Sequence, residues 1–160
     1  MDDLTSQQGP QDDAGVVAAC RELHAAIDAL DERAAKVLGV SRNDLRCLNL
    51  LERGPVSPTR IAETLALTKG SVTTLIDRLE RKNLVSRKSS PNDGRAVVVE
   101  ATSEAWMVLA NIYRPFGEAL SDLSGRYGPD RAKVVSQALF EIAALCRTEA
   151  GKSQSMSSAG

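Results

Sequence analysis

The chain has 160 residues, of which 42% are hydrophobic and 26% charged, a composition typical of a folded globular protein. Its apolar runs are too short for a membrane span, and its acidic, polar N-terminus is the opposite of a signal peptide, so we expect a cytoplasmic protein with no membrane partner. Three widely spaced cysteines without a C-x-x-C motif predict neither a zinc site nor a disulfide framework. They are expected to be buried, reduced thiols, and no cofactor is expected.

The net charge of −1 hides a strong asymmetry along the chain. Residues 41–95 hold 11 lysines and arginines against 6 acidic residues, whereas the remainder holds 9 against 15. A basic module inside an acidic frame produces the local positive field that contact with phosphates requires. The charge distribution therefore favours nucleic acid as a partner, although a solvated basic face without a partner has the same signature.

Residues 1–14 and 151–160 lack hydrophobic periodicity and are predicted to be mobile tails. A first helix is expected over about 15–38, with Gly39 as its C-cap. Apolar residues recur along it at alternating spacings of four and three: Val16, Cys20, Leu23, Ile27, Leu30, Ala34 and Val37. Such a heptad stripe is typical of a helix that packs against another helix, so 15–40 is predicted to be a dimerisation helix, with Val16, Leu23 and Ile27 in the interface.

Three shorter helices are expected next. The first covers about 42–53 and ends at Gly54-Pro55. The second begins after Ser57 as N-cap, with Pro58 at its first position, and runs to about Leu65. The third follows a short turn and covers Thr68 to about Lys82. Two helices joined this closely match the helix-turn-helix pattern, in which the second helix enters the major groove of DNA.

After residue 82 the hydrophobic period changes. Residues 84–89 and 96–102 are predicted strands, and the turn-forming segment 90–94 between them predicts a hairpin. Thr102 is expected to cap a helix that reaches about Leu123 and is kinked at Pro115. A break over Gly125–Pro129 and a sixth helix to about Glu149 follow. Residues 103–150 are predicted to be dimerisation helices, with Leu139 and Ile142 in the interface.

The predicted fold is therefore mainly α with a small β-hairpin wing: a winged helix-turn-helix over residues 41–102, flanked by N- and C-terminal dimerisation helices. One face of the helix over 68–82 is apolar and the opposite face is polar. Small hydroxyl residues near its N-terminus suit base edges, and Lys69 and Arg78 suit phosphates. The candidate DNA-binding residues of this helix are Lys69, Gly70, Ser71, Thr73, Thr74 and Arg78.

The hairpin carries the second candidate DNA-binding element. Its residues of interest are Arg87, Lys88, Asp93 and Arg95. A basic hairpin beside a recognition helix can place an arginine in the neighbouring minor groove, where A·T-rich tracts are narrow and electronegative. Asp93 can orient the Arg95 guanidinium by a charge-assisted hydrogen bond, and it also suits the turn itself.

These motifs resemble the winged helix of the MarR family of bacterial transcriptional regulators. The matching pieces are Thr68–Thr74, Asp77-Arg78-Leu79-Glu80, Leu84-Val85-x-Arg87 and Asp93-x-Arg95. The order of the flanking helices also agrees, so the resemblance covers about residues 15–149. Asn83 stands where glycine is common, and Ala101 and Ala105 replace the usual leucine and glycine. The resemblance implies a homodimer that binds double-stranded DNA at a pseudo-palindromic operator, most simply as a repressor, and that a small-molecule effector can release.

Other functions compete with this one. An enzyme is disfavoured because the chain has no phosphate-binding loop, no nucleophile elbow, no metal-ligand cluster and only one histidine. Some members of the family sense peroxide through a cysteine on the first helix, so Cys20 defines a redox-sensing alternative. His24, Trp106 and Tyr113 are candidates for an effector pocket, although each can instead be a core or interface residue. A dimeric interaction module that does not bind DNA is the alternative from another class; it would need a neutral recognition face.

Overall fold

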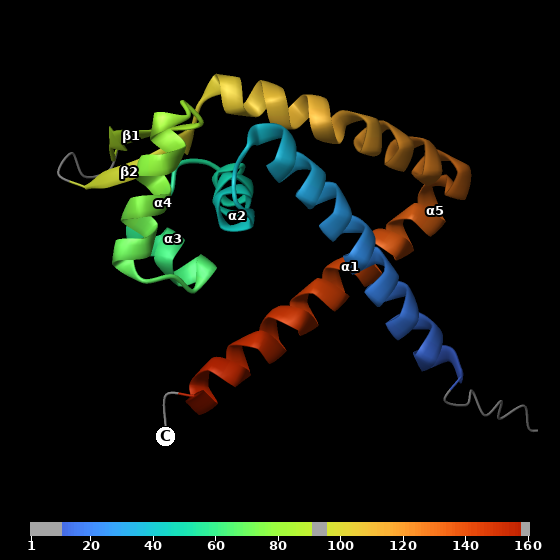
Figure 1. Ribbon diagram of the computed structural model, residues 1–160. Helices are drawn as coiled ribbons and strands as arrows, with labels where there is room; N and C mark the ends of the chain where they lie inside the picture. The colour runs from blue at the N-terminus through green and yellow to red at the C-terminus, as the bar shows by residue number, and fades with distance from the viewer. Residues whose placement is uncertain (1–10, 91–95, 158–160) are drawn as a thin grey trace, which may run out of the picture. The chain divides into compact units, whose positions relative to one another are not determined.

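A computed structural model describes residues 11–90 and 96–157 of the chain (Figure 1). Its elements are α1 (Gln11–Leu38), α2 (Arg42–Leu51), α3 (Pro58–Leu65), α4 (Lys69–Arg81), β1 (Val85–Ser89), β2 (Val97–Ala101) and α5 (Ser103–Ser157). This mainly α architecture with one antiparallel hairpin confirms the predicted fold class. The chain forms two compact units, one within residues 1–112 and the other within 113–160, and α5 contributes to both.

Side chains cap the three short helices where the sequence predicts their starts. The Ser41 and Asp44 side chains form a capping box at the N-terminus of α2. Ser57 accepts from the backbone N–H of Arg60 at the start of α3, and Thr68 accepts from that of Ser71 at the start of α4. These bonds satisfy backbone donors that have no partner within the helix, so each helix begins at a defined residue.

Aliphatic side chains from α2, α3, α4, the hairpin and the start of α5 form the core of the first unit. Its buried members include Leu45, Leu48, Ile61, Val72, Leu75, Ile76, Leu79 and Val99. No aromatic residue contributes to the buried core among the described residues, as the aromatic content of 3% predicts. This core seats α4 by its apolar face and leaves its other face open.

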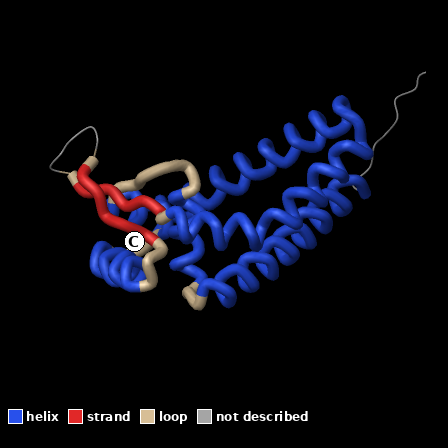
Figure 2. Tube along the Cα trace, turned by 90° about the horizontal axis from the view of Figure 1, so that it is seen from above, coloured by secondary structure: helices blue, strands red, loops and turns tan. Residues whose placement is uncertain are grey.

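The hairpin has one register, from Val85 opposite Ala101 to Ser89 opposite Val97. Figure 2, with strands in red, shows the two running side by side. Val99 also exchanges two backbone hydrogen bonds with Val56, at 2.9 and 2.8 Å, so the segment before α3 pairs with the other edge of β2. Pairing on both sides and complete burial make Val99 the residue that anchors the hairpin to the helices.

The last helical segment, α5, is interrupted where the sequence predicts a break. Within α5 only Gly128 departs from helical backbone angles (φ 75°, ψ 164°), and the kink there divides α5 into two helices, so the predicted break and the further helix that follows it are confirmed. Pro129 disfavours a helical conformation in the residue before it, and glycine alone adopts a positive φ at little cost. At Pro115 the backbone angles stay helical, so the chain is not interrupted at the position where the sequence predicts a proline kink.

The predicted tails are also too long, because α1 begins at Gln11 and α5 ends at Ser157. Residues 11–14 and 151–157 therefore continue the adjoining helices. Helix extension adds one hydrogen bond per ordered residue once a helix exists, so polar residues without hydrophobic periodicity can join its ends.

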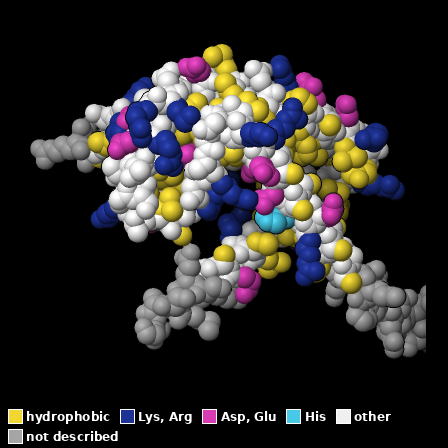
Figure 3. Space-filling model, in the orientation of Figure 1, with side chains coloured by type: hydrophobic (Ala, Val, Ile, Leu, Met, Phe, Trp, Pro, Cys, Tyr) yellow, Lys and Arg dark blue, Asp and Glu magenta, His cyan; other side chains and the backbone are white. Residues whose placement is uncertain are grey.

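Many large hydrophobic side chains on α1 and α5 are exposed in this single chain. On α1 they include Val16, Leu23 and Ile27, and on the part of α5 within the second unit they include Val134, Leu139, Phe140 and Leu145. Phe140 is 75% exposed. Figure 3 shows hydrophobic side chains, in yellow, open on the surface along the long helices. Ile142, also predicted in the interface, is half-buried.

Candidate DNA-binding surface

Helices α3 and α4 form the predicted helix-turn-helix. The chain leaves α3 through Ala66, which adopts a left-handed conformation (φ 54°), and re-enters a helix after Thr68. Asn83, after the end of α4, is also left-handed (φ 56°), as its tolerance of that conformation predicts. Both turns are short, so α4 is held tightly between α3 and the hairpin.

The outward face of α4 carries the residues predicted to read bases. Lys69, Gly70, Ser71, Thr73 and Thr74 are all exposed, whereas Val72, Leu75, Ile76 and Leu79 are buried beneath them. A Cβ added at Gly70 would meet no atom within 4 Å, so this position is open to a close approach by another molecule. The structure therefore brings together the first five predicted residues of the recognition helix.

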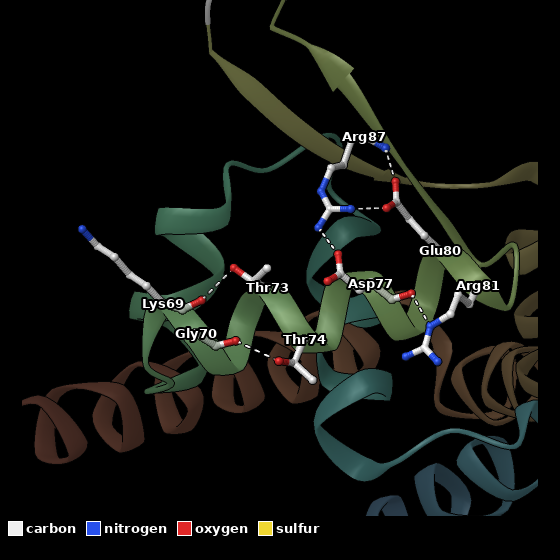
Figure 4. Close-up of polar contacts among 8 residues, drawn as sticks. All are labelled: Lys69, Gly70, Thr73, Thr74, Asp77, Glu80, Arg81 and Arg87. Carbon is white, nitrogen blue, oxygen red and sulfur yellow. Dashed lines mark hydrogen bonds and ion pairs between the residues drawn. The ribbon is translucent and has the colours of Figure 1, made fainter.

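The hydroxyl groups of this face have defined orientations. Thr73 Oγ1 donates to the Lys69 carbonyl at 3.1 Å, and Thr74 Oγ1 donates to the Gly70 carbonyl at 3.1 Å (Figure 4). Because each hydroxyl proton is used within the helix, the oxygens face outward as hydrogen-bond acceptors. An acceptor in the major groove suits the exocyclic amino groups of adenine or cytosine.

Lys69 lies at the N-terminal end of α4, and its side chain extends away from the helix (Figure 4). Within the described part of the chain it forms no ion pair. An exposed ammonium group without a carboxylate partner is available to a phosphate, and the phosphate contact of Lys69 stays a prediction.

Arg78 does not lie free on this face. Its Nε donates to Asp44 Oδ2 at 2.9 Å and its Nη2 donates to Asp44 Oδ1 at 2.5 Å, a bidentate ion pair between α4 and α2. The Asp44 side chain is 0% exposed and that of Arg78 is 39% exposed. Arg78 was expected to contact a phosphate, but the Nε and Nη2 groups of its guanidinium are bound to a buried carboxylate.

Asp44 remains ionised in this environment. Burial alone would raise the pKa of Asp44, but the hydrogen bonds from Arg78 and Ser41 outweigh it, so the pKa lies below its ordinary value. The backbone N–H of Ser41 donates to Oδ2 at 2.9 Å as the second half of the capping box. One carboxylate thus caps the N-terminus of α2 and binds Arg78 in the C-terminal half of α4.

Arg87 is likewise paired with carboxylates of this chain, although its side chain is 34% exposed. From β1 its guanidinium reaches α4, where it forms an ion pair with Glu80 and another with Asp77, the latter with Nη2 to Oδ1 at 2.6 Å (Figure 4). Lys88 Nζ lies 2.5 Å from Glu100 Oε1 across the hairpin. The two described basic residues of the wing are therefore neutralised by neighbours, which differs from their expected direct contact with DNA. Asp93 and Arg95 lie outside the described residues.

Asp44, Asp77 and Glu80 were not predicted as functional residues. The spacing of Ser41 and Asp44 is a recognisable capping box, but it carries no information on a partner in α4. Glu80 and Arg87 belong to adjacent predicted elements, which is the only sequence signal for their pairing. The count of charged residues over 41–95 included all these side chains, but it could not show which of them form ion pairs with one another.

The candidate effector residues do not form one described pocket. His24 lines a cleft of about 370 Å³ between α1 and α2, together with Ile27, Asp28, Asp31, Arg42, Leu45 and Arg46. Trp106 is half-buried in the first unit and does not line this cleft, and Tyr113 is half-buried in the second unit. The cleft mixes apolar walls with charges of both signs.

The three cysteines have different environments. Cys20 on α1 is half-buried, Cys47 is buried, and Cys146 is exposed. The expectation that all are buried is therefore wrong for Cys146. Burial, and secondarily the Asp44 charge, raises the pKa of Cys47 to about 12, which makes its thiol unreactive. Redox sensing by Cys20 stays a prediction.

Membrane-spanning and metal-binding features are both absent from the part of the chain that the structure describes. No helix in 11–90 or 96–157 is long and apolar enough to span a membrane. The same residues hold no cluster of three or more histidine, cysteine or acidic side chains that could bind a metal ion.

Comparison with known proteins identifies the family of this chain. The model of the MarR family matches residues 38–96. The uncharacterized HTH-type transcriptional regulator YcgE of Bacillus subtilis is 30% identical over 119 residues, which are 74% of this chain and 77% of YcgE. A mutant of MepR from a multidrug-resistant S. aureus clinical isolate has a similar fold, with a TM-score of 0.67 at 16% identity over 82% of this chain and 96% of MepR. Another S. aureus MepR mutant, solved bound to an oligodeoxyribonucleotide, has a TM-score of 0.54 at 17% identity over 82% of this chain and 97% of its own.

Proposed function

Because this chain belongs to the MarR family of DNA-binding transcriptional regulators, we propose that it is a sequence-specific repressor that binds a pseudo-palindromic operator as a homodimer. The observation that carries this proposal is the outward face of α4. One face of α4 carries an exposed lysine and three exposed hydroxyl residues, and the opposite face is apolar and buried. The exposed face can therefore enter a major groove while the apolar face stays packed in the core. Because the proposed partner is duplex DNA, we propose that the protein acts in the cytoplasm.

Dimerisation is supported by the exposed apolar residues of α1 and α5. Burying a leucine or valine stabilises a protein by about 1.5–3 kcal/mol, so leaving Leu23, Ile27, Leu139 and Phe140 in water would be costly. In a two-fold dimer the recognition helices lie about 34 Å apart, one turn of B-DNA. Each winged helix then buries about 600–1,000 Å² against its half-site, so we expect two linked copies to bind far more tightly than one.

Release from DNA is proposed to involve a small-molecule effector. The cleft beside His24 supports this, because it lies between α1 and α2, and Asp44 in the first turn of α2 binds Arg78 in α4. An effector lowers operator affinity only by binding the conformation that does not bind DNA more tightly, and tenfold release needs about 1.4 kcal/mol of differential affinity. Repression itself follows from occupancy, since a bound dimer blocks RNA polymerase.

The experiment is selection of bound fragments from random duplex DNA, followed by fluorescence anisotropy and sedimentation. We expect an enriched sequence with two inverted half-sites, bound by two copies of the chain. A half-site duplex is the matched control and should bind much more weakly. Failure to enrich any sequence would contradict specific recognition, and a monomer that binds the full site tightly would contradict the dimer.

The dimer is tested separately with Leu139→Glu, which places a charge on the exposed apolar face of α5. We expect this variant to sediment as a monomer and to lose operator binding. Lys133→Glu, a neighbouring exposed position outside the predicted interface, is the control and should remain dimeric. Dimeric Leu139→Glu protein would remove this face from the interface.

A further inference from the structure

Asp44 is the one buried charged residue among the described residues. Its two oxygens receive three hydrogen bonds: two from Arg78 in α4 and one from the Ser41 backbone at the start of α2. Side-chain N and O atoms buried in the described structure all have partners, so this small network is complete. A complete buried network is rigid, whereas a partly satisfied one is costly.

The network constrains α4 in a way that the core does not. Val72, Leu75, Ile76 and Leu79 are aliphatic, and aliphatic packing is non-directional, so it tolerates small rotations of the helix. A bidentate arginine–carboxylate pair is directional, since both N–H···O bonds must be aligned at once. It joins residues 34 positions apart in the chain, one on the recognition helix and the other in the first turn of α2.

Accordingly, we propose that Asp44 is a positioning residue for DNA recognition. By binding Arg78 it fixes the rotation and the axial position of α4. Arg78 then supports DNA binding through this ion pair and does not contact a phosphate. This proposal rests on the proposed function, because it assigns a part in the binding of duplex DNA. Nε and one Nη2 proton of Arg78 are engaged, and its side chain is 39% exposed. The two uses of Arg78 therefore lead to opposite expectations for Asp44.

A phosphate contact and a positioning pair respond differently to three substitutions. If Arg78 contacts phosphate, Asp44→Asn frees its charge and binding becomes tighter, Arg78→Lys keeps most of the affinity, and Arg78→Gln lowers the slope of log K against log salt by about one. If Arg78 positions α4, Asp44→Asn weakens binding, Arg78→Lys fails because an ammonium group lacks the fork, and the slope stays unchanged. Salt dependence is a readout that a purely positional change leaves alone.

The test is anisotropy titration of full-length protein with the selected operator duplex, between about 50 and 200 mM salt. We expect Asp44→Asn, Arg78→Lys and Arg78→Gln each to weaken binding about tenfold, a loss that matches one charge-assisted hydrogen bond. The double variant Asp44→Asn/Arg78→Gln should lose no more than either single variant, because both remove one interaction. Glu63→Gln is the matched control: it removes a carboxylate from an exposed pair with Arg60 on α3 and should bind like the parent.

Loss of folding is separated from loss of positioning by working well below each variant's unfolding temperature, measured by circular dichroism. The double variant leaves no unpaired buried charge, so it remains usable where a single variant unfolds. Tighter binding by Asp44→Asn, or a reduced salt slope for the Arg78 variants, overturns the positioning assignment alone. A parent protein that binds no selected duplex overturns the proposed function, and this is seen before any variant is made.

Discussion

Arg87 in β1 binds Glu80 in α4 twice. Its backbone N–H donates to Glu80 Oε1 at 3.1 Å, and its guanidinium forms an ion pair with the same carboxylate. The second ion pair of that guanidinium, with Asp77, lies one helical turn nearer the base-reading end of α4. Two carboxylates on a surface that must approach phosphates would repel DNA, and Arg87 neutralises them while it ties the hairpin to the recognition helix.

Arg87→Gln is therefore expected to weaken operator binding by leaving these two carboxylates uncompensated, and to destabilise the fold by less than about 1 kcal/mol. Asp77→Asn/Glu80→Gln in the same background should restore most of the affinity. Both are measured by anisotropy at fixed salt, with urea unfolding for stability. If the triple variant binds no better than Arg87→Gln alone, Arg87 acts on DNA directly.

Lys69→Ala is expected to weaken binding to all duplexes alike and to reduce the salt slope by about one, because an unpaired ammonium group at the start of α4 neutralises a phosphate. A salt series on the operator and on an unrelated duplex measures both effects. Lys133→Ala on α5 removes the same charge elsewhere and is the control. Loss of specificity in place of affinity would show that Lys69 contacts a base.

Thr74→Val removes the outward acceptor oxygen while it keeps the shape of the side chain. We expect a loss of about 1–3 kcal/mol in discrimination at one base pair of each half-site, with binding to unrelated DNA unchanged. Binding to operators with each single base-pair change locates that position. Equal weakening on every duplex would mean that the substitution had disturbed the helix and not the readout.

Cys47 should resist alkylation in the native protein at pH 8, where a thiol with a pKa of about 12 is ionised in only about one molecule in ten thousand. Exposed Cys146 should react first. Mass spectrometry after iodoacetamide, with and without urea, measures this, and Cys146→Ser removes the fast reaction as a control. Rapid native labelling of Cys47 would show that α2 opens readily.

Acid should destabilise the protein partly through Asp44. Its pKa is lower in the folded than in the unfolded chain, so the unfolded state binds the proton more readily and stability falls as pH drops from the ordinary carboxyl range to the lowered value. Above that range the contribution is constant. Urea unfolding between pH 7 and pH 3 should be less pH-dependent in Asp44→Asn/Arg78→Gln than in the parent. Identical pH profiles would show that other carboxylates account for acid unfolding.

Local chemistry determined much of this protein without reference to its fold. Ser57 and Thr68 accept hydrogen bonds from backbone N–H groups three residues away, and Asn83 tolerates the left-handed conformation that follows α4. The starts of α3 and α4 and the end of α4 therefore followed from the sequence. The apolar period of α4 likewise predicted which face would be open, because helix geometry alone relates those positions. The family resemblance rests on the same local motifs.

Tertiary structure decided what the charged side chains do. Asp44 and Arg78 are 34 residues apart, and no local rule brings them together; the packing of α4 on α2 does. The same holds for the hairpin, whose Arg87 pairs with Asp77 because the fold places β1 beside α4. Opposite charges pair wherever the fold places them within reach, and burial strengthens the pairing by excluding water. The excess of basic residues over 41–95 that favoured DNA as a partner is correct as a number. Two of these arginines, Arg78 and Arg87, form ion pairs that hold α4 in place. The exposed lysine and hydroxyl groups of α4 remain as the proposed contacts to the major groove.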